Sequence, residues 1–244
     1  MSNTRVKTGI PGFDELLNGG FLQGDVVMVA GSSGTGKTIF CLQYLIDGII
    51  ESGDPGLFIS FEQSPEQIYR DALNFGWDLK KLEEENKFRL VYTSPQLLLG
   101  TDSGEQILDD LLEEFHPKRL AIDSLRFLEM FVENVNLREE FYRLIMYLKT
   151  KGISALLTWE TPNITESATG FGNEHLAFLV DCIVLMRLVE IESVLKKVIL
   201  VLKMRGSDHD KHLREYSITS KGITILPVFH GIEGIVASPP KRKA

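Results

Sequence analysis

Apolar residues along this chain fall into short uninterrupted runs rather than into an alternating pattern of apolar and polar positions. Runs of strand length cover residues 25–31, 56–62, 88–92, 119–123 and 153–159. A strand with one face in water alternates, whereas a continuous apolar run is typical of a strand buried on both faces. The chain is therefore predicted to build its core around a fully covered sheet.

Segments with helical spacing separate these runs and cover residues 37–52, 64–75, 102–116 and 137–150. The second begins Ser-Pro-Glu-Gln, which predicts an N-cap at Ser64, Pro65 in the first helical position and a capping box closed by Gln67. Strands that alternate with helices predict an α/β fold with a mostly parallel sheet covered on both faces.

The pattern changes after the last of these strands. Residues 160–175 are polar and predict a long exposed loop. Strand-like runs follow at residues 181–193, 194–206, 213–219 and 222–228. They predict antiparallel strands added to the parallel core on its C-terminal side. We expect one domain over residues 1–238 and a disordered basic tail over residues 239–244.

Composition narrows the class of protein. The 244 residues are 43% hydrophobic with a net charge of −8, and no apolar run has the roughly 18 residues of a membrane span or the form of a secretory signal. We therefore expect a cytoplasmic protein that does not enter membranes. The negative charge argues against a surface that coats nucleic acid. Cys41 and Cys182 lie in apolar segments and are expected to be buried side chains rather than disulfide or metal ligands.

A glycine-rich octet follows the strand 25–31 and precedes the helix 37–52. It matches the phosphate-binding (Walker A) pattern G-x-x-x-x-G-K-[ST] as Gly31-Ser32-Ser33-Gly34-Thr35-Gly36-Lys37-Thr38. Glycines let successive N–H groups surround phosphate oxygens, and the helix N-terminus adds its positive dipole. Lys37 is expected to contact the β- and γ-phosphates of ATP or ADP, and Thr38 to bind Mg²⁺. The alternative is a flexible turn without a ligand.

Asp123 ends the apolar strand 119–123, where a P-loop protein needs a second group on the magnesium side. We expect it to hold Mg²⁺ through water. The alternative is that Asp123 caps a helix beginning in the sequence DSLRFLEM.

Glu62 is the candidate for the group that activates water, because it ends the strand 56–62 and ligands gather at the carboxyl ends of parallel strands. Glu66 also lies nearby, but an acid in the first turn of a helix is explained by the helix dipole. Glu160 is a weaker candidate, and Thr158 or Glu160 are options for contacting the γ-phosphate.

The stretches TGIPGFDELLNGGFLQGDVVMVAGSSGTGKT, FISFEQSPEQI, RLAIDSL and VLKMRGSDHDKHLREYSITSKGI together make the chain resemble the RecA superfamily. Within it, the chain is similar to the KaiC family of circadian-clock ATPases and their archaeal single-domain relatives. The resemblance covers nearly the whole chain. It implies a RecA-like P-loop fold that forms a homo-oligomeric, usually hexameric, ring with ATP held between neighbours.

In that family a Lys-x-Arg pair reaches the next subunit's nucleotide, and Lys203-Met204-Arg205 matches it. The resemblance thus implies catalytic roles for Lys203 and Arg205 and nucleotide contacts for Met204 and His209. An arginine that acts from a neighbour stabilises charge on the transferring phosphoryl group. From the residues alone, Lys203 and Arg205 are better explained as solvated positions of an edge strand, since they alternate with Met204.

Two departures limit the resemblance. Glu62 is followed by Gln63 where family members commonly carry a second glutamate, and an amide orients water but is a poor base. Slow hydrolysis is therefore expected. The clock proteins contain two ATPase halves, and their second half phosphorylates itself on a Ser-Thr pair shortly after a His. Here His175 is followed by residues 176–178 without a hydroxyl, so neither autophosphorylation nor clock function is expected.

The leading hypothesis is an enzyme, a Mg²⁺-dependent ATPase with regulatory or signalling output, in which Gln63 assists Glu62. A second hypothesis is a nucleotide-loaded scaffold that recruits an unknown signalling partner with negligible turnover. A third is a DNA recombination protein, although residues 160–175 contain three glutamates and no Lys or Arg. His209 and His212, with the neighbouring aspartates, are too weak a pattern to predict a metal site.

Overall fold

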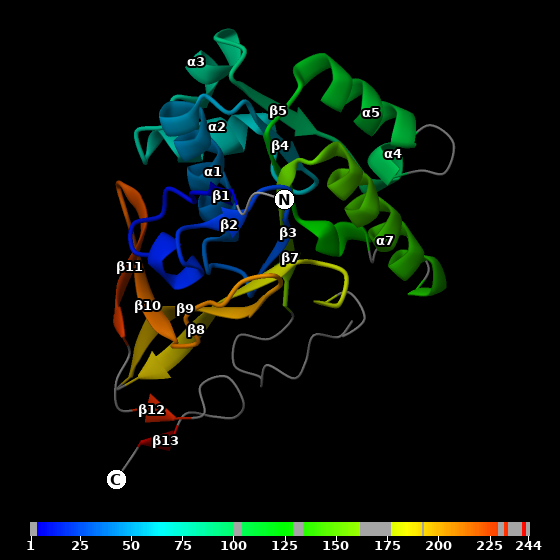
Figure 1. Cartoon of the computed structure of the whole chain (residues 1–244). Coiled ribbons are helices and arrows are strands. Elements are labelled where there is room, and N and C mark those ends of the chain that lie inside the picture. The colour runs from blue at the N-terminus through cyan, green and yellow to red at the C-terminus, as the bar shows by residue number, and fades with distance from the viewer. Residues whose placement is uncertain are drawn as a thin grey trace.

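The computed structural model describes residues 4–99, 104–128, 134–161, 177–191, 193–228, 232–233 and 241–242. A nine-stranded sheet runs through it in the order β11-β10-β9-β8-β3-β7-β6-β4-β5 (Figure 1). These strands are β3 (Val26–Gly31), β4 (Gly56–Ser60), β5 (Phe88–Tyr92), β6 (Arg119–Asp123), β7 (Ser154–Glu160), β8 (Cys182–Ile191), β9 (Val194–Met204), β10 (Arg214–Thr219) and β11 (Gly222–Val228).

The strands from β8 to β5 are parallel to one another, and β9, β10 and β11 continue the sheet in antiparallel fashion. This confirms the predicted parallel core with antiparallel strands on its C-terminal side. Two short antiparallel pairs stand apart from the sheet: β1 (Arg5–Val6) with β2 (Phe21–Leu22), and β12 (Ile232–Glu233) with β13 (Lys241–Arg242). The expected domain boundary at residue 238 lies outside the described residues and stays a prediction.

Helices cover both faces of the sheet (Figure 1). They are α1 (Lys37–Asp47), α2 (Pro65–Leu73), α3 (Leu79–Glu84), α4 (Pro95–Leu99), α5 (Gly104–Phe115) and α7 (Asn134–Lys151), with the 3-10 turns η1 (Asp14–Leu17) and η3 (Leu125–Phe127). A π-helical turn, η2 (Gly48–Ser52), extends α1, so the predicted helix 37–52 is confirmed in two parts. The capping box of Ser64 and Gln67 is present at the start of α2.

The apolar runs are buried on both faces, as their lack of alternation predicts. Along β3, Val27 and Val29 belong to an apolar cluster that includes side chains of α1, α2 and η1, whereas Val26 and Met28 belong to a cluster that includes side chains of α5 and α7. Cys41 and Cys182 are both buried and unbonded, which confirms their expected role as small core side chains. No helix among the described residues is both long and apolar enough to span a membrane.

The expected strand 56–62 ends two residues early, at Ser60. The hydroxyl of Ser60 accepts the N–H of Gln63 at 3.1 Å and donates to the carbonyl of Gln63 at 2.9 Å. A short polar side chain that satisfies its neighbours' backbone in this way closes a turn instead of continuing a strand. Glu62 therefore projects from a turn beyond the sheet edge rather than from the strand itself.

Arg119, at the start of β6, is the largest polar side chain in the core and is 1% exposed. Its guanidinium donates to Asp54 at 3.1 Å and to the carbonyls of Lys7 and Tyr44 at 2.9 Å each, and it lies 4.7 Å from the centre of the Tyr44 ring. A Cβ atom at Gly48 would come within 2.2 Å of the guanidinium Nε, so only glycine fits in this turn. The arginine thus joins the N-terminal segment, α1 and the sheet.

Arg119→Met is predicted to lower the free energy of unfolding by about 3 kcal/mol, because it removes the buried guanidinium's hydrogen bonds to Asp54 and to the carbonyls of Lys7 and Tyr44. Arg70→Met is the matched control, since Arg70 is 71% exposed in its pair with Asp71, and it should change stability by less than about 0.5 kcal/mol. Urea denaturation of both variants measures the difference. Equal stability of the two variants would contradict the role of Arg119.

Candidate active site

The glycine-rich octet forms the turn between β3 and α1. Gly36 has φ 94°, a left-handed conformation, and a Cβ atom at Gly31 would come within 2.4 Å of the Met186 carbonyl oxygen. Thr35 closes the loop by donating from its hydroxyl to the carbonyl of Ser32 at 2.8 Å. The loop is held from outside by the Tyr216 hydroxyl, which donates to the carbonyl of Thr35 at 2.5 Å. These contacts fix the loop at the N-terminus of α1, where a phosphate group is favoured.

Lys37 is 8% exposed, and its ammonium donates to the carbonyl of Ser32 at 3.1 Å. Burial lowers its pKa, while the nearby carboxylates of Glu160, Asp123 and Glu62 act in the opposite direction. The amine therefore lies inside the loop, close to the acids at the ends of β6 and β7 and to Glu62 in the turn after β4.

Asp123 is buried at the carboxyl end of β6 and connects two neighbouring elements. Its Oδ2 accepts the Thr38 hydroxyl at 2.5 Å, and its Oδ1 accepts the hydroxyl of the buried Thr158 on β7. The alternative that Asp123 caps the following helix is wrong. Ser124 holds the N-cap of η3 and accepts the Arg126 N–H at 3.4 Å.

These residues open into a cleft of about 430 Å³. Its polar wall includes Lys37, Thr38, Glu62, Gln63, Asp123 and Glu160. Its apolar wall consists of Ile39, Leu42, Ile68, Ala72, Phe75 and Ile218. The structure therefore brings together the octet, the strand-end aspartate and the Glu62-Gln63 pair that the sequence singled out.

Glu62 stands at the rim of this cleft. Partial burial raises the pKa of its carboxyl group above the ordinary value, and the negative charges of Asp123 and Glu160 raise it further. A carboxylate with a raised pKa is a better proton acceptor, so the environment suits a general base. Glu160 lines the same cleft and is the second candidate for the residue that activates water.

Hard oxygen ligands and an ordered anion-binding loop fit the groups that the sequence predicts. Thr38 and Asp123 supply a hydroxyl and a carboxylate, the ligand types that Mg²⁺ prefers, and the loop supplies backbone N–H groups for phosphates. Within the described residues, no three His, Cys, Asp or Glu side chains are placed to enclose a metal ion by themselves. A Mg²⁺ ion here would need phosphate oxygens and water molecules as its remaining ligands.

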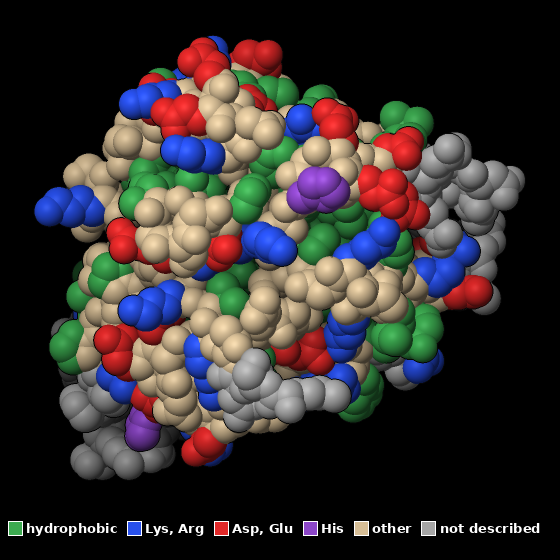
Figure 2. Space-filling model, turned by 45° about the horizontal axis from the view of Figure 1, so that its top comes forward, with side chains coloured by type: hydrophobic (Ala, Val, Ile, Leu, Met, Phe, Trp, Pro, Cys, Tyr) green, Lys and Arg blue, Asp and Glu red, His purple; other side chains and the backbone are tan. Residues whose placement is uncertain are grey.

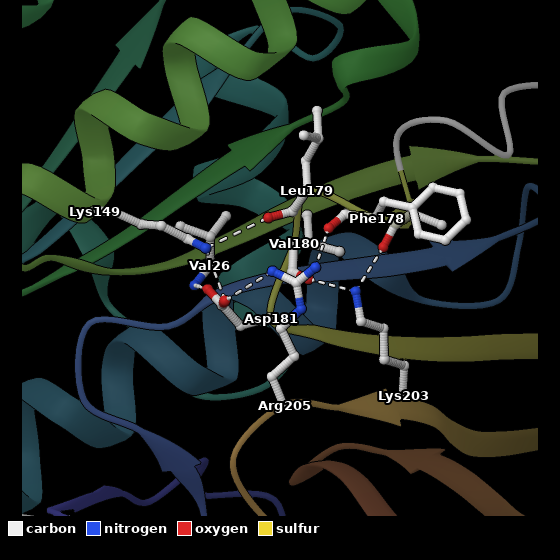
Figure 3. Close-up of polar contacts among 9 residues, drawn as sticks. Val26, Lys149, Phe178, Leu179, Val180, Asp181, Lys203 and Arg205 are labelled. Carbon is white, nitrogen blue, oxygen red and sulfur yellow. Dashed lines mark hydrogen bonds and ion pairs between the residues drawn. The ribbon is translucent and has the colours of Figure 1, made fainter.

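Lys203 and Arg205 do not line this cleft, and they lie beside Phe178, Val180 and Asp181 (Figure 3). Met204 pairs with Cys182 on β8, which pairs with Val27 on β3, four residues before Gly31. At about 3.3 Å per residue, Lys203 and Arg205 lie ~13 Å from Gly31 along the strand direction, toward the end of β3 that is opposite the P-loop. The predicted set therefore divides into two groups, one in the cleft and one at the far edge.

The Met204 side chain is buried in the core of its own chain, and His209 follows in the turn beyond β9. Neither lines the cleft described above. Their nucleotide contacts stay predictions, as does most of the loop 160–175, whose residues 162–175 lie outside the described ranges.

Several residues around the loop could not be predicted from the sequence. Lys197 on β9 donates to the carbonyl of Gly34 at 2.5 Å, and Tyr216 on β10 contacts Thr35. The apolar wall also joins α2 to Ile218, over a long separation in sequence. No local motif marks such positions, because only the antiparallel pairing of β9 and β10 brings them beside the P-loop.

Fold and site together define a P-loop nucleotide-binding domain of the RecA-like type. A family model described as "ATPase: KaiC" matches residues 6–229. The chain belongs to this KaiC ATPase family, as the resemblance in sequence indicated.

Relatives support the assignment over the whole chain. The chain is 35% identical to "Circadian clock protein KaiC3" of Synechocystis sp. over 243 residues, which cover 100% of this chain and 48% of that protein. It thus spans about half the length of these clock relatives. It is 34% identical to "UPF0273 protein MJ1359" of Methanocaldococcus jannaschii, covering 91% of this chain and 96% of the relative.

A solved structure has the same architecture. The crystal structure of KaiC-like protein PH0186 from Pyrococcus horikoshii OT3 superposes with a TM-score of 0.81 at 32% identity. The match covers 93% of this chain and 100% of that one.

Thr158→Val is predicted to raise the Mg²⁺ concentration needed for half-maximal ATP turnover by roughly tenfold, because Asp123 loses a hydrogen bond that orients it. Thr150→Val is the control, since Thr150 is exposed and its hydroxyl donates to the Tyr147 carbonyl within α7 at 2.7 Å. A magnesium titration of turnover compares the two. An unchanged requirement in Thr158→Val would show that Thr158 does not orient the ligand.

Proposed function

We propose that this chain binds Mg-ATP in the cleft at the carboxyl ends of β3, β4 and β6 and hydrolyses it. In this proposal a neighbouring copy completes each site, and the copies form a homo-oligomeric ring, a hexamer. The observation that carries the proposal is the convergence of Lys37, Thr38, Glu62 and Asp123 on one cleft beside the P-loop. Family membership supports ATPase chemistry in general.

The chain's own groups have separate roles in this scheme. The N–H groups of the loop bind the phosphate oxygens, and Lys37 neutralises charge on the β- and γ-phosphates. Thr38 and, through water, Asp123 would hold Mg²⁺, which when bound would supply positive charge beside the phosphates. The apolar wall formed by Ile39, Leu42 and Phe75 gives the nucleotide base a surface that excludes water.

Glu62 orients and deprotonates the attacking water, and the raised pKa of its carboxyl group makes it a better proton acceptor. Gln63 also lines the cleft and positions water through its amide without accepting a proton. A single acid where relatives carry two agrees with slow turnover. Slow turnover in turn suits a regulatory or signalling cycle in the cytoplasm, in which the nucleotide state of the ring is what a partner recognises.

The position of Lys203 and Arg205 supports their action on a second copy. They lie toward the sheet edge opposite the P-loop of their own chain, and the Lys203 ammonium donates to the carbonyls of Ala177 and Val180 at 2.8 and 2.7 Å. A neighbour whose P-loop edge packs against this edge would receive both cations at its nucleotide. Charge stabilisation from a neighbour couples hydrolysis to assembly.

Two alternatives remain distinguishable by experiment. Gln63 favours a nucleotide-loaded scaffold, and phosphate release above background from the pure ring would exclude it. A DNA-binding role has little support on the face shown in Figure 2, where basic and acidic side chains of the described residues are interspersed. DNA-stimulated, salt-sensitive ATPase activity would nevertheless establish it.

Glu62→Gln is predicted to keep nucleotide affinity and to lower phosphate release by at least about a hundredfold, because the base is lost while the phosphate contacts stay. Lys37→Ala should abolish binding of the nucleotide itself. Glu66→Gln is the matched control, since this exposed glutamate occupies the first turn of α2 and should leave turnover unchanged. Calorimetric ATP binding and a phosphate-release assay separate the three results. Normal turnover in Glu62→Gln would move the base to another residue, with Glu160 next.

Arg205→Ala is predicted to slow turnover by at least about tenfold. Mixing it in equal amounts with Glu62→Gln should restore activity at roughly a quarter of the interfaces, where an intact Glu62 meets an intact neighbouring Arg205. The control mixture replaces Glu62→Gln with the variant that carries both substitutions, which supplies neither group. Phosphate release measured after co-assembly decides the matter. Absence of recovery in a mixed ring of normal mass would contradict a site shared between copies.

A further inference from the structure

The basic pair at the far edge of the sheet rests on a seat of carbonyl groups. The seat is formed by residues 177–180, which directly precede β8 (Figure 3). Lys203 donates to the carbonyls of Ala177 and Val180, and Arg205 donates to the carbonyl of Phe178. The Arg205 side chain is 49% exposed, so its guanidinium contacts the seat and is open to solvent at the same time.

Asp181 ends this seat and is joined to three elements. Its N–H donates to the carbonyl of Val26, and its carbonyl accepts the Arg205 N–H, both at 2.8 Å. Its carboxylate accepts the Val26 N–H at 3.0 Å and the Lys149 ammonium at 2.7 Å, and lies 3.8 Å from the Arg205 guanidinium. The Asp181 side chain is only 14% exposed. The Asp181 backbone therefore holds the backbone of Arg205, and the Asp181 carboxylate influences the direction of the Arg205 side chain.

The charges of this cluster leave the basic pair attractive to an anion. Lys149 shares the Asp181 carboxylate, so that carboxylate does not fully neutralise Arg205. Burial and the positive charge of the neighbouring Arg205 guanidinium lower the pKa of Lys203. Asp25 adds a second acid, whose pKa burial and Asp181 raise to about 6. Three cations face two acids, and the carbonyl partners of the basic pair carry no net charge.

We propose that Asp181 is a positioning residue that aims Arg205 at the nucleotide of the neighbouring copy. This inference rests on the proposed function, in which Arg205 acts between copies. Asp181 touches neither nucleotide nor water in this scheme. It sets the direction of the guanidinium through the ion pair and holds the start of the side chain through the backbone hydrogen bond. Lys149 keeps the carboxylate from retaining the arginine too strongly.

Asp181→Asn tests the proposal, because asparagine keeps an oxygen that accepts the Val26 N–H but removes the charge that orients Arg205. We expect kcat for ATP to fall by between about tenfold and a hundredfold. The KM for ATP should change by less than about twofold, since the contacts that bind the nucleotide within the chain are intact. Asp109→Asn is the matched control. Asp109 lies on α5, and its carboxylate pairs at 2.7 Å with Lys151 of α7, the helix that also carries Lys149. That control should leave kcat unchanged.

Two further measurements exclude a merely structural role. Asp181→Asn in the Arg205→Ala background should cause no additional loss of kcat, because an effect that passes through Arg205 disappears with it. Mixed with Glu62→Gln, Asp181→Asn should regain turnover, since the partner variant supplies a correctly aimed Arg205 to an intact cleft. Equal further loss in both backgrounds, or no recovery on mixing, would overturn the positioning role.

The outcomes also distinguish failure of the Asp181 proposal from failure of the proposed role of Arg205 between copies. Wild-type turnover in Arg205→Ala would remove the role of Arg205 between copies, and with it the reason for Asp181. Slow turnover in Arg205→Ala together with normal turnover in Asp181→Asn would remove only the positioning role. Ring mass and thermal unfolding of each variant confirm that the compared species have the same assembly and fold.

Discussion

The cleft depends on a single carboxylate that is shared by separate elements. Asp123 extends from β6, accepts a hydroxyl from the first turn of α1 and accepts another from β7. Parallel pairing makes this possible, because β3, β6 and β7 all present their carboxyl ends at one edge of the sheet. Hydrogen bonds to one buried acid therefore link the first turn of α1 to the carboxyl ends of β6 and β7.

A second constraint acts at the opposite end of β6. Arg119 begins the strand that Asp123 ends, and its guanidinium bonds to the N-terminal segment and to the C-terminal half of α1. The strand thus holds α1 through a buried cation at one end and through a buried carboxylate at the other. With both ends of the helix tied to the same strand, the P-loop has little freedom to move away from β6.

Much of the fold could be predicted from the sequence, because burial on both faces leaves a strong signal in runs such as 119–123 and 153–159. The octet 31–38 could be found for a similar reason, since the loop geometry accepts few residues besides glycine at its special positions. Helices α3 and α4 were not predicted, because six and five residues are too few to display an apolar period. The end of β4 depended on a side-chain hydrogen bond at Ser60, which an apolar run does not reveal.

The site was predictable where its residues are sequential or end a strand, as with Lys37, Asp123 and Glu62. It was not predictable where distant strands meet, as with Lys197, Tyr216 and Ile218. The seat of Arg205 belongs to the same class. Asp181 precedes Arg205 by a whole hairpin, and only the register of β8 against β9 places the two side by side. The resemblance to the family identified Lys203 and Arg205, whereas the residues that surround them are brought together only by the fold.

In the proposed assembly, the location of the P-loop and of Arg205 toward opposite ends of the strands of one sheet restricts the symmetry. Two copies related by a twofold axis would join like surface to like surface, and each would leave its donor edge facing away from the other's acceptor edge. Contacts between unlike edges are heterologous, and they either close into a cyclic group or propagate as a helical filament. Which of these results is set by the rotation between successive copies, so the geometry of one interface determines whether the assembly is closed or endless.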